Sequence, residues 1–434
     1  MLSKTKADIK AFLTSSGAIT VLDAVRNVVT ANLLGPYMAG VCMTLMVIPQ
    51  VTQYMNIGII DALQVLVPRY RGSGKTPERL KNTVLSVSIL IASSALIAVL
   101  LYVLAFSPYS RSTNILIVMA GLLSFFFPAK KYFVTLYAAN DRFRKLSLIE
   151  FSFSSIVTVS QITFLYFFGA VGFWMGFLFT NLVVTAWLAK NYMKENTLRP
   201  FSIDLKELKT AVPLGMSMLI CGVSYMPFLL LARLFLAKAG GVKEVGYFVL
   251  AMVILAKLSI VPSAIAKVIM PKISRMHAES GSLDESYKLY LKAQLLTFAM
   301  TLFIFAVGLL SMEKVVSVIM PQYVHGVPGA KMMLLAGIPF CLIDNANNFI
   351  LALEQKRIYL FTLATAIAAQ ILIFITLYYY GTASAAAIST SLIYVFLFYA
   401  ILVNAQVFRL HRRSCSTRRV ASDIGVMGTG LKIS

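Results

Sequence analysis

Five basic residues lie inside long apolar stretches of this 434-residue chain: Arg26, Lys130, Lys131, Arg233 and Lys257. A charged side chain in the middle of a bilayer costs about 2.5 to 3.5 kcal/mol on insertion scales, so it is expected to face a polar interior or a partner. Lysine and arginine pair with carboxylates and with phosphate oxygens. The chemistry open to these residues is therefore the binding of an anionic group within the apolar part of the protein.

The depth of each basic residue can be estimated from its place in its apolar run, at about 1.5 Å per helical residue. Lys257 falls near the middle of its run, and we expect it to line a cavity because neither surface is within easy reach. Arg26 and Arg233 fall in the outer half of their runs, and Lys130 and Lys131 fall toward the cytoplasmic end. Together they predict a basic path through most of the bilayer.

Four of these residues also have a second interpretation. Lys130 and Lys131 could extend to the inner membrane surface, and Arg233 could extend to the outer one. Arg26 follows Asp23 by three residues, which places both on one helical face and allows a purely structural ion pair. The sequence leaves these alternatives open.

The elements that carry these residues are membrane-spanning helices. The chain is 59% hydrophobic and only 13% charged, whereas soluble domains are about 25% charged. About twelve apolar runs reach the roughly 20 residues that a helix needs to cross the hydrocarbon. Since backbone polar groups in lipid must be satisfied internally, we predict an all-α polytopic membrane protein with about 12 transmembrane helices.

The opening pair of runs is repeated in the second half of the chain. Leu34-Gly35-Pro36 separates the first pair, and Ala239-Gly240-Gly241 separates the later one. Pro68-Arg69 ends the first copy, and Pro271-Lys272 ends the second. The repeat predicts two six-helix bundles related by a pseudo-two-fold axis, the usual arrangement of duplicated transporters that work by alternating access. The predicted divisions are a first bundle at 1–193, an amphipathic linker at 194–210, a second bundle at 211–406 and a basic tail at 407–434.

The formal net charge of +22 is mainly a signal of orientation. Most Lys and Arg residues fall at the N-terminus, in every second loop or in the tail, and such a bias marks the cytoplasmic side. We therefore expect both termini in the cytoplasm and contact between these loops and membrane lipid. No aromatic residues alternate with the basic ones as a nucleic-acid surface would require, so nucleic acid is not an expected partner.

Catalytic and metal sites are not predicted. The four cysteines have no disulfide or metal spacing, and His277, His325 and His411 are isolated. No sizeable loop carries paired carboxylates. We expect no enzyme activity and no cofactor, apart from coupling to protons or sodium.

Several short motifs, taken in order, resemble those of a transporter family. Each is weak alone, but their order and the span count are similar to the Wzx-type polysaccharide repeat-unit flippases, in the polysaccharide branch of the multidrug/oligosaccharidyl-lipid/polysaccharide exporter superfamily. The resemblance covers roughly residues 11–405. It rests on Leu34-Gly-Pro-Tyr-Met-Ala-Gly40, Met55-Asn-Ile-Gly58, Pro68-Arg-Tyr-Arg71, Ala139-Asn-Asp-Arg-Phe143, Val212-Pro-Leu-Gly215, Val245-Gly-Tyr-Phe248 and Ile319-Met-Pro-Gln-Tyr323.

The resemblance implies a flippase in a bacterial inner membrane that moves an undecaprenyl-diphosphate-linked oligosaccharide outward, for O-antigen, capsule or exopolysaccharide synthesis. It also implies a polysaccharide polymerase and a chain-length regulator as partners. The family's cationic cavity would correspond here to the five basic residues, which would bind the diphosphate. One departure concerns the seventh span, where many relatives pair an acid with a base, whereas Arg233 has no carboxylate beside it.

A polar patch follows the Gly337-Ile-Pro339 interruption. Asp344 and Asn348 are four residues apart and share a helical face, and Asn345 and Asn347 lie beside them. We predict that Asn345 and Asn348 contact the sugar and that Asp23 and Asp344 couple transport to a cation. The alternative is that the patch only forms hydrogen bonds with neighbouring helices. Asp61 and Glu150 are predicted near the cytoplasmic interface.

Three rival functions remain. A cation-coupled multidrug antiporter of the same superfamily would need an acidic cavity. A membrane enzyme acting on lipid-linked sugars would need a catalytic motif. A flippase for lipid-linked peptidoglycan precursors usually resembles a fourteen-span relative.

Overall fold

The computed structural model describes residues 2–106, 110–140, 143–194, 202–222, 226–259, 283–353 and 355–423, together with Pro262, Ile265 and Ile273. Described side chains within these helices begin at residue 17 and end at residue 412. The Pro271-Lys272 pair, which is expected to end the second copy of the repeat, and the end of the tail lie outside the described part. By contacts the chain forms two compact units, Met1–Val223 and Ser224–Ser434.

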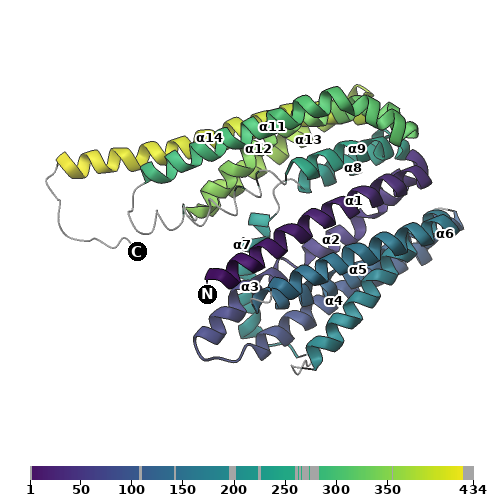
Figure 1. Ribbon diagram of the computed structural model, residues 1–434, viewed down its shortest axis with the longest axis horizontal. Coiled ribbons are helices and arrows are strands. Elements are labelled where there is room, and N and C mark those ends of the chain that lie inside the picture. The colour runs from purple at the N-terminus through teal and green to yellow at the C-terminus, as the bar shows by residue number, and fades with distance from the viewer. Residues whose placement is uncertain are drawn as a thin grey trace. The chain divides into compact units, whose positions relative to one another are not determined.

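The first unit consists of seven helices within the described ranges (Figure 1). Helix α5 packs against α4 and α6, and α6 also packs against α1. These long helices are joined by shorter ones that pack on α5 and α7. The bounds are α1 Leu2–Leu45, α2 Val47–Met55, α3 Ile59–Gly72, α4 Glu78–Phe106, α5 Arg111–Ala139, α6 Phe143–Met193 and α7 Leu205–Gly222.

Helices α1 and α6 each contain two arms joined at a glycine. Gly35 in α1 has φ 68° and Gly169 in α6 has φ 58°, a region that a residue without Cβ adopts at little cost. These are the positions where the sequence predicts turns between spans. Each of these helices therefore supplies two of the expected crossings.

The two arms of α6 pack closely because the second arm presents small residues. A Cβ atom at Gly176 would lie 2.5 Å from the Cα of Gln161. Ser160 Oγ lies 2.7 Å from Thr180 Oγ1 and donates to the Gly176 carbonyl at 3.2 Å. Small residues that let backbones approach, reinforced by hydroxyl hydrogen bonds, are typical of helix pairs in membranes.

In the second unit, α12 is the helix that most others contact. It packs against α9, α11 and α14, and most of its side chains are buried. The described elements are α8 Met226–Ala239, α9 Val242–Leu258, α11 Leu283–Ile319, the 3₁₀ turn η1 Pro321–Gly326, α12 Val327–Ala352, α13 Lys356–Tyr379 and α14 Ala385–Asp423 (Figure 1).

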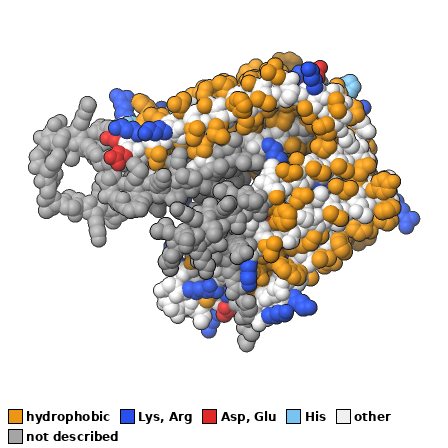
Figure 2. Space-filling view, viewed as in Figure 1, with side chains coloured by type: hydrophobic (Ala, Val, Ile, Leu, Met, Phe, Trp, Pro, Cys, Tyr) orange, Lys and Arg blue, Asp and Glu red, His pale blue; other side chains and the backbone are white. Residues whose placement is uncertain are grey.

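The fold class is confirmed as an all-α polytopic membrane protein. Among the described residues, eight helical segments are long and apolar enough to cross a membrane. Two of them, Gly17–Gly72 and Lys145–Met193, each hold two of the expected spans. Helices α7, α8 and α9 are too short or too polar to be counted as membrane spans on their own. Figure 2 shows hydrophobic side chains over much of the described part of one face.

Helix α7 belongs to the first unit by its contacts, although the sequence predicts that the second bundle begins at residue 211. Its first turn is held by Tyr70, which donates to Glu207 Oε2 at 2.7 Å, and the Asp204 amide just before it donates to Thr83 Oγ1 at 2.9 Å. Residues 195–201 of the expected linker lie outside the described part. The bundle boundaries therefore stay a prediction.

Two glycines bring α7 into backbone contact with the start of α3. A Cβ atom at Gly215 would lie 2.7 Å from the carbonyl carbon of Gly58, and Gly58 itself has φ 68°. Both glycines end motifs that carry the family resemblance. These two motifs, separated in the sequence, therefore meet in space.

We predict that Gly215→Ala destabilises the protein, because the added methyl meets backbone that cannot rotate away. Overpacking of this kind costs about 1 to 3 kcal/mol. Thermal unfolding of the purified protein in detergent measures the effect. Gly17→Ala is the matched control, since nothing lies within 4 Å of its Cβ position; equal melting temperatures for both variants would contradict the close crossing.

Candidate functional site

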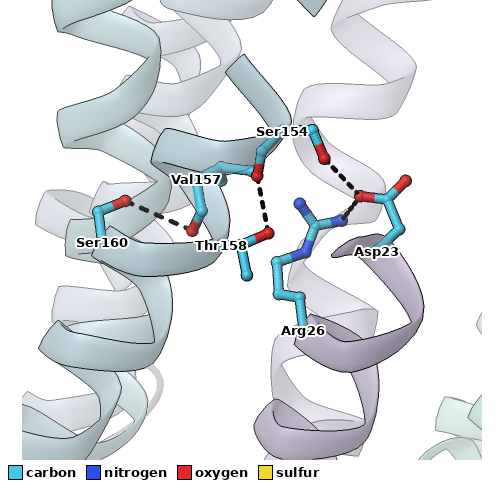
Figure 3. A network of polar contacts seen from close by, with 6 residues as sticks. All are labelled: Asp23, Arg26, Ser154, Val157, Thr158 and Ser160. Atoms are coloured by element: carbon cyan, nitrogen blue, oxygen red, sulfur yellow. Dashed lines mark hydrogen bonds and ion pairs between the residues drawn. The ribbon is translucent and has the colours of Figure 1, made fainter. Parts of the chain in front are cut away.

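The first unit contains an ion pair within its membrane-spanning part. Arg26 Nη2 lies 2.9 Å from Asp23 Oδ1, on consecutive turns of α1 (Figure 3). The side chains are 15% and 30% exposed, respectively. The pair is thus only partly open, and its two charges compensate each other.

Helix α6 supplies a second partner for the carboxylate. Ser154 Oγ donates to Asp23 Oδ1 at 3.3 Å, and Thr158 Oγ1 donates to the Ser154 carbonyl at 2.7 Å (Figure 3). The Arg26 guanidinium carbon lies 5.9 Å from the centre of the Phe177 ring on the other arm of α6. One face of α1 therefore meets a hydroxyl from one arm and an aromatic ring from the other.

Lys130 of α5 belongs to the same group of charges. Its Nζ lies 3.4 Å from the centre of the Phe153 ring, in the position of a cation–π contact. Glu150 and Arg26 are both near enough to act on its ammonium electrostatically. We call Asp23, Arg26, Lys130 and Glu150 the first-unit charge cluster.

Lys131, the next residue of α5, has a partner on a different helix. Its Nζ lies 2.7 Å from Asp61 Oδ2 of α3, with the two side chains 28% and 21% exposed. The contact joins helices whose charged residues are far apart in the sequence. It accounts for Asp61, which the sequence alone placed at the interface without a partner.

The three basic candidate residues of the first unit therefore have acidic or aromatic neighbours. Arg26 has Asp23, Lys131 has Asp61, and Lys130 has Phe153 with Glu150 close by. An anionic ligand would have to compete with these carboxylates or exchange with them. Such a site can bind an anion while remaining nearly neutral when empty, which lowers the cost of burying it.

In the second unit, Arg233 and Lys257 occupy different settings. Arg233 of α8 is 4% exposed, and its Nε donates to the Leu229 carbonyl at 3.4 Å. Lys257, in the last turn of α9, is half-buried and has no ion-pair partner among the described residues. Its predicted depth depends on a span extending to residue 269, most of which lies outside the described part.

The amide patch of α12 is largely occupied by hydrogen bonds between helices. Asn345 is buried and donates to Thr297 Oγ1 at 2.7 Å and to Gln294 Oε1 at 3.2 Å, both on α11. Asn347 donates to the Tyr399 hydroxyl of α14 at 3.1 Å. These contacts agree with the alternative interpretation, in which the patch only forms hydrogen bonds with neighbouring helices. A role of Asn345 in binding a ligand stays a prediction.

Asp344 and Asn348 lie on the less buried side of the same helix. Both are half-buried, and the charge of Asp344 acts on Cys341 and on the Tyr399 hydroxyl. The role of Asp344 in coupling stays a prediction.

Sequence reasoning found Asp23 as the partner of Arg26 but missed the partners of Lys130 and Lys131. Glu150, Phe153 and Ser154 lie on one stretch of α6, and Glu150 and Ser154 are four residues apart on one face. That spacing was a usable signal for a polar stripe. No local pattern could link Asp61 to Lys131, because the link depends on how α3 packs against α5.

Comparison with known proteins places the fold among transporters. No family model and no curated protein matches the sequence. The structure is similar to the lipid II flippase MurJ in an inward closed conformation, with a TM-score of 0.73, 13% identity, and 96% of this chain and 93% of that chain covered. It is also similar to an inward-facing multidrug resistance MATE family transporter of the MOP superfamily, with a TM-score of 0.71, 14% identity, and 92% and 96% covered.

A third similar structure comes from Pyrococcus furiosus. It is a MOP superfamily transporter described by a reverse polarity of its binding pocket that suggests a different function. The TM-score is 0.55 at 14% identity, with 94% of each chain covered. At such identities the likeness extends to the fold, which is that of MOP-superfamily transporters, and the ligand must be argued from this chain's own residues.

We predict that Asp23→Asn lowers the thermal stability of the protein, because Arg26 would keep its charge and lose its counter-ion. For a partly exposed pair, the loss should be about 1 to 3 kcal/mol, between the values for surface and buried pairs. Combining Asp23→Asn with Arg26→Gln should recover part of that loss in thermal unfolding of the purified protein.

The control is the exposed pair in which Lys331 Nζ lies 2.8 Å from Glu313 Oε2. Glu313→Gln should leave the melting temperature unchanged. Additive effects of Asp23→Asn and Arg26→Gln would mean that the two side chains do not stabilise each other.

Proposed function

We propose that this protein is a flippase for a lipid whose headgroup is a diphosphate-linked oligosaccharide, of the polyprenyl type. It would move the headgroup from the cytoplasmic to the outer leaflet of a bacterial inner membrane by alternating access, for O-antigen, capsule or exopolysaccharide synthesis. The transport step breaks no covalent bond, so the residues act by binding. A polysaccharide polymerase and a chain-length regulator would be its partners.

The observation that carries the proposal is the first-unit charge cluster. Arg26 and Lys130 come from different helices, yet both meet the same stretch of α6. Lys130 Nζ lies 3.4 Å from the Phe153 ring, and the next residue, Ser154, donates to the Asp23 carboxylate that pairs with Arg26. A diphosphate that entered hydrocarbon alone would lose its hydration without compensation. Two cations that donate hydrogen bonds to phosphate oxygens would replace part of that hydration.

The carboxylates beside these cations give the proposed site a resting state. When no ligand is present, Asp23 neutralises Arg26 at 2.9 Å. When a diphosphate arrives, its oxygens would take the place of the carboxylate, and Asp23 would keep its hydrogen bond from Ser154 or gain a proton. Asp23 would then couple transport to a cation, as its position beside the ligand suggests.

In the second unit, Lys257 and Arg233 would supply further positive charge, and Asn348 with Asn345 would contact sugar hydroxyls. Lys257 is the better candidate of the two cations, because Arg233 is nearly inaccessible. Asp344 would be the second coupling group. The membrane potential favours the outward passage of negative charge by about 2.3 kcal/mol per charge per 100 mV, unless a co-moving cation cancels it.

The fold is compatible with transport of a lipid-linked headgroup, but it does not determine which ligand is transported. One similar structure is a lipid II flippase and another is a multidrug resistance transporter, so the same architecture serves both. The Pyrococcus furiosus structure is described by a reversed pocket polarity. Local charge must therefore distinguish the functions, and here the membrane-embedded ligand candidates are mostly basic.

We predict that Arg26→Gln and Lys257→Ala each lower surface polysaccharide in cells that depend on this protein. Losing one charge-assisted hydrogen bond costs about 1.5 to 3 kcal/mol, which corresponds to roughly a tenfold or larger drop in transport. Surface polysaccharide should be measured at equal protein abundance, together with the lipid-linked sugars accumulated in the inner leaflet. Lys288→Ala, at an exposed position that the sequence predicts to be cytoplasmic, is the control and should behave as wild type. Normal polysaccharide in Lys257→Ala cells would remove that residue from the site.

The rival function is a cation-coupled multidrug antiporter. An organic cation needs an acidic site, and the carboxylates Asp23, Asp61 and Glu150 are the groups that could form one. We expect no export of an organic cation such as ethidium above background when the purified protein is reconstituted in vesicles with a proton or sodium gradient. Gradient-driven export that Asp23→Asn abolishes and Arg26→Gln spares would favour the antiporter over the flippase.

A further inference from the structure

Each unit carries three consecutive aromatic residues at the turn of one helical hairpin. In the first unit these are Tyr166, Phe167 and Phe168, directly before Gly169 of α6; we call them the first aromatic tip. In the second unit they are Tyr378, Tyr379 and Tyr380, directly before Gly381 between α13 and α14; we call them the second aromatic tip. Gly169 and Gly381 have φ 58° and 66°, so each turn has a glycine with positive φ directly after the aromatic triplet.

The side chains of both tips are open to their surroundings within the described structure. The first tip is 73%, 70% and 55% exposed in chain order, and the second tip is 59%, 88% and 73% exposed. The rings contact mainly each other: Tyr166 and Phe167 have centroids 5.4 Å apart, and Tyr379 and Tyr380 have centroids 6.1 Å apart. Six large rings at two turns are therefore not part of either core.

The surface continues from each tip along its helix. Val159 of α6 is 67% exposed and Leu372 of α13 is 65% exposed, and both lie in segments that can span a membrane. Neither tip contains a charged residue. Each tip is thus the end of an exposed apolar surface on a helix that is long enough to cross a membrane. The distribution of basic loops predicts that this end faces outward.

From this placement we propose that both aromatic tips are anchors that bind the headgroup and carbonyl layer of the outer leaflet. Tyrosine rings concentrate at membrane–water interfaces because the ring prefers an apolar contact and the hydroxyl a wet one. The tips hold four tyrosines and two phenylalanines, and three such aromatic rings exposed to bulk water would be an unusually large apolar surface for one turn. The anchors would hold the outer end of one hairpin in each unit at a fixed depth.

The competing occupant is a sugar, because carbohydrate rings also stack on aromatic faces. The observations favour lipid for two reasons. The tips continue an exposed apolar surface, and no charged or amide side chain that could bind sugar hydroxyls belongs to either triplet. The experiment treats sugar binding as an outcome that would overturn the proposal.

Tryptophan fluorescence quenching by lipids can measure the depth of each tip. The chain has two tryptophans, buried Trp174 and exposed Trp187, so a Trp187→Phe background leaves one constant signal to subtract. Phe167→Trp and Tyr379→Trp report on the tips. Val159→Trp and Leu372→Trp are matched controls on the same helices, about 12 and 10 Å deeper.

The full-length variants are reconstituted into phosphatidylethanolamine and phosphatidylglycerol vesicles that carry a spin label near the headgroup or near the chain end. We expect stronger quenching of both tip tryptophans by the shallow label, and the reverse order for both controls. Phe168→Trp and Tyr380→Trp should repeat the result if either first variant unfolds. Three results would each overturn the proposal. Neither label quenches the tip tryptophans; the deep label quenches them as strongly as it quenches the controls; or a soluble oligosaccharide protects them while the shallow label does not quench them.

Discussion

The need to neutralise charge in an apolar environment governs the inner part of the first unit. Arg26, Lys130 and Lys131 lie in helices that cross the membrane, and each has a compensating group within a few ångströms. These partners come from three different helices, so the charges also fix how α1, α3, α5 and α6 pack against one another. A single requirement thus links the position of the helices to the proposed binding of an anion.

This compensation changes how a cationic cavity should be understood. A set of unpaired cations would bind a diphosphate strongly, but it would be costly to bury while empty. The arrangement around Asp23 lowers that cost, because the carboxylate pairs with Arg26 and accepts a hydrogen bond from Ser154 when no ligand is bound. Under the proposed function, binding would become an exchange of counter-ions, which would ease release of the ligand on the other side of the membrane.

The sequence predicted the helical membrane fold and the turns at Gly35 and Gly169, because long apolar runs and glycine positions are local signals. The Asp23–Arg26 pair was also visible, since three residues separate the two on one helix. Sequence reasoning could not predict that Lys131 meets Asp61, or that Asn345 is occupied by Thr297 and Gln294, because these contacts depend on which helix faces come together. The placement of α7 beside α3 was missed for the same reason, since its apolar pattern is compatible with either bundle.

The close fit of the two arms of α6 has a consequence for biogenesis. The arms are joined by an uncharged turn at Gly169 and linked by the hydroxyls of Ser160 and Thr180. During synthesis, such a pair can leave the translocon as one helical hairpin, with the Ser160 and Thr180 hydroxyls already hydrogen-bonded before any other helix arrives. The hairpin would then present Ser154 and Phe177 as a preformed surface, against which α1, inserted earlier, packs its charged face.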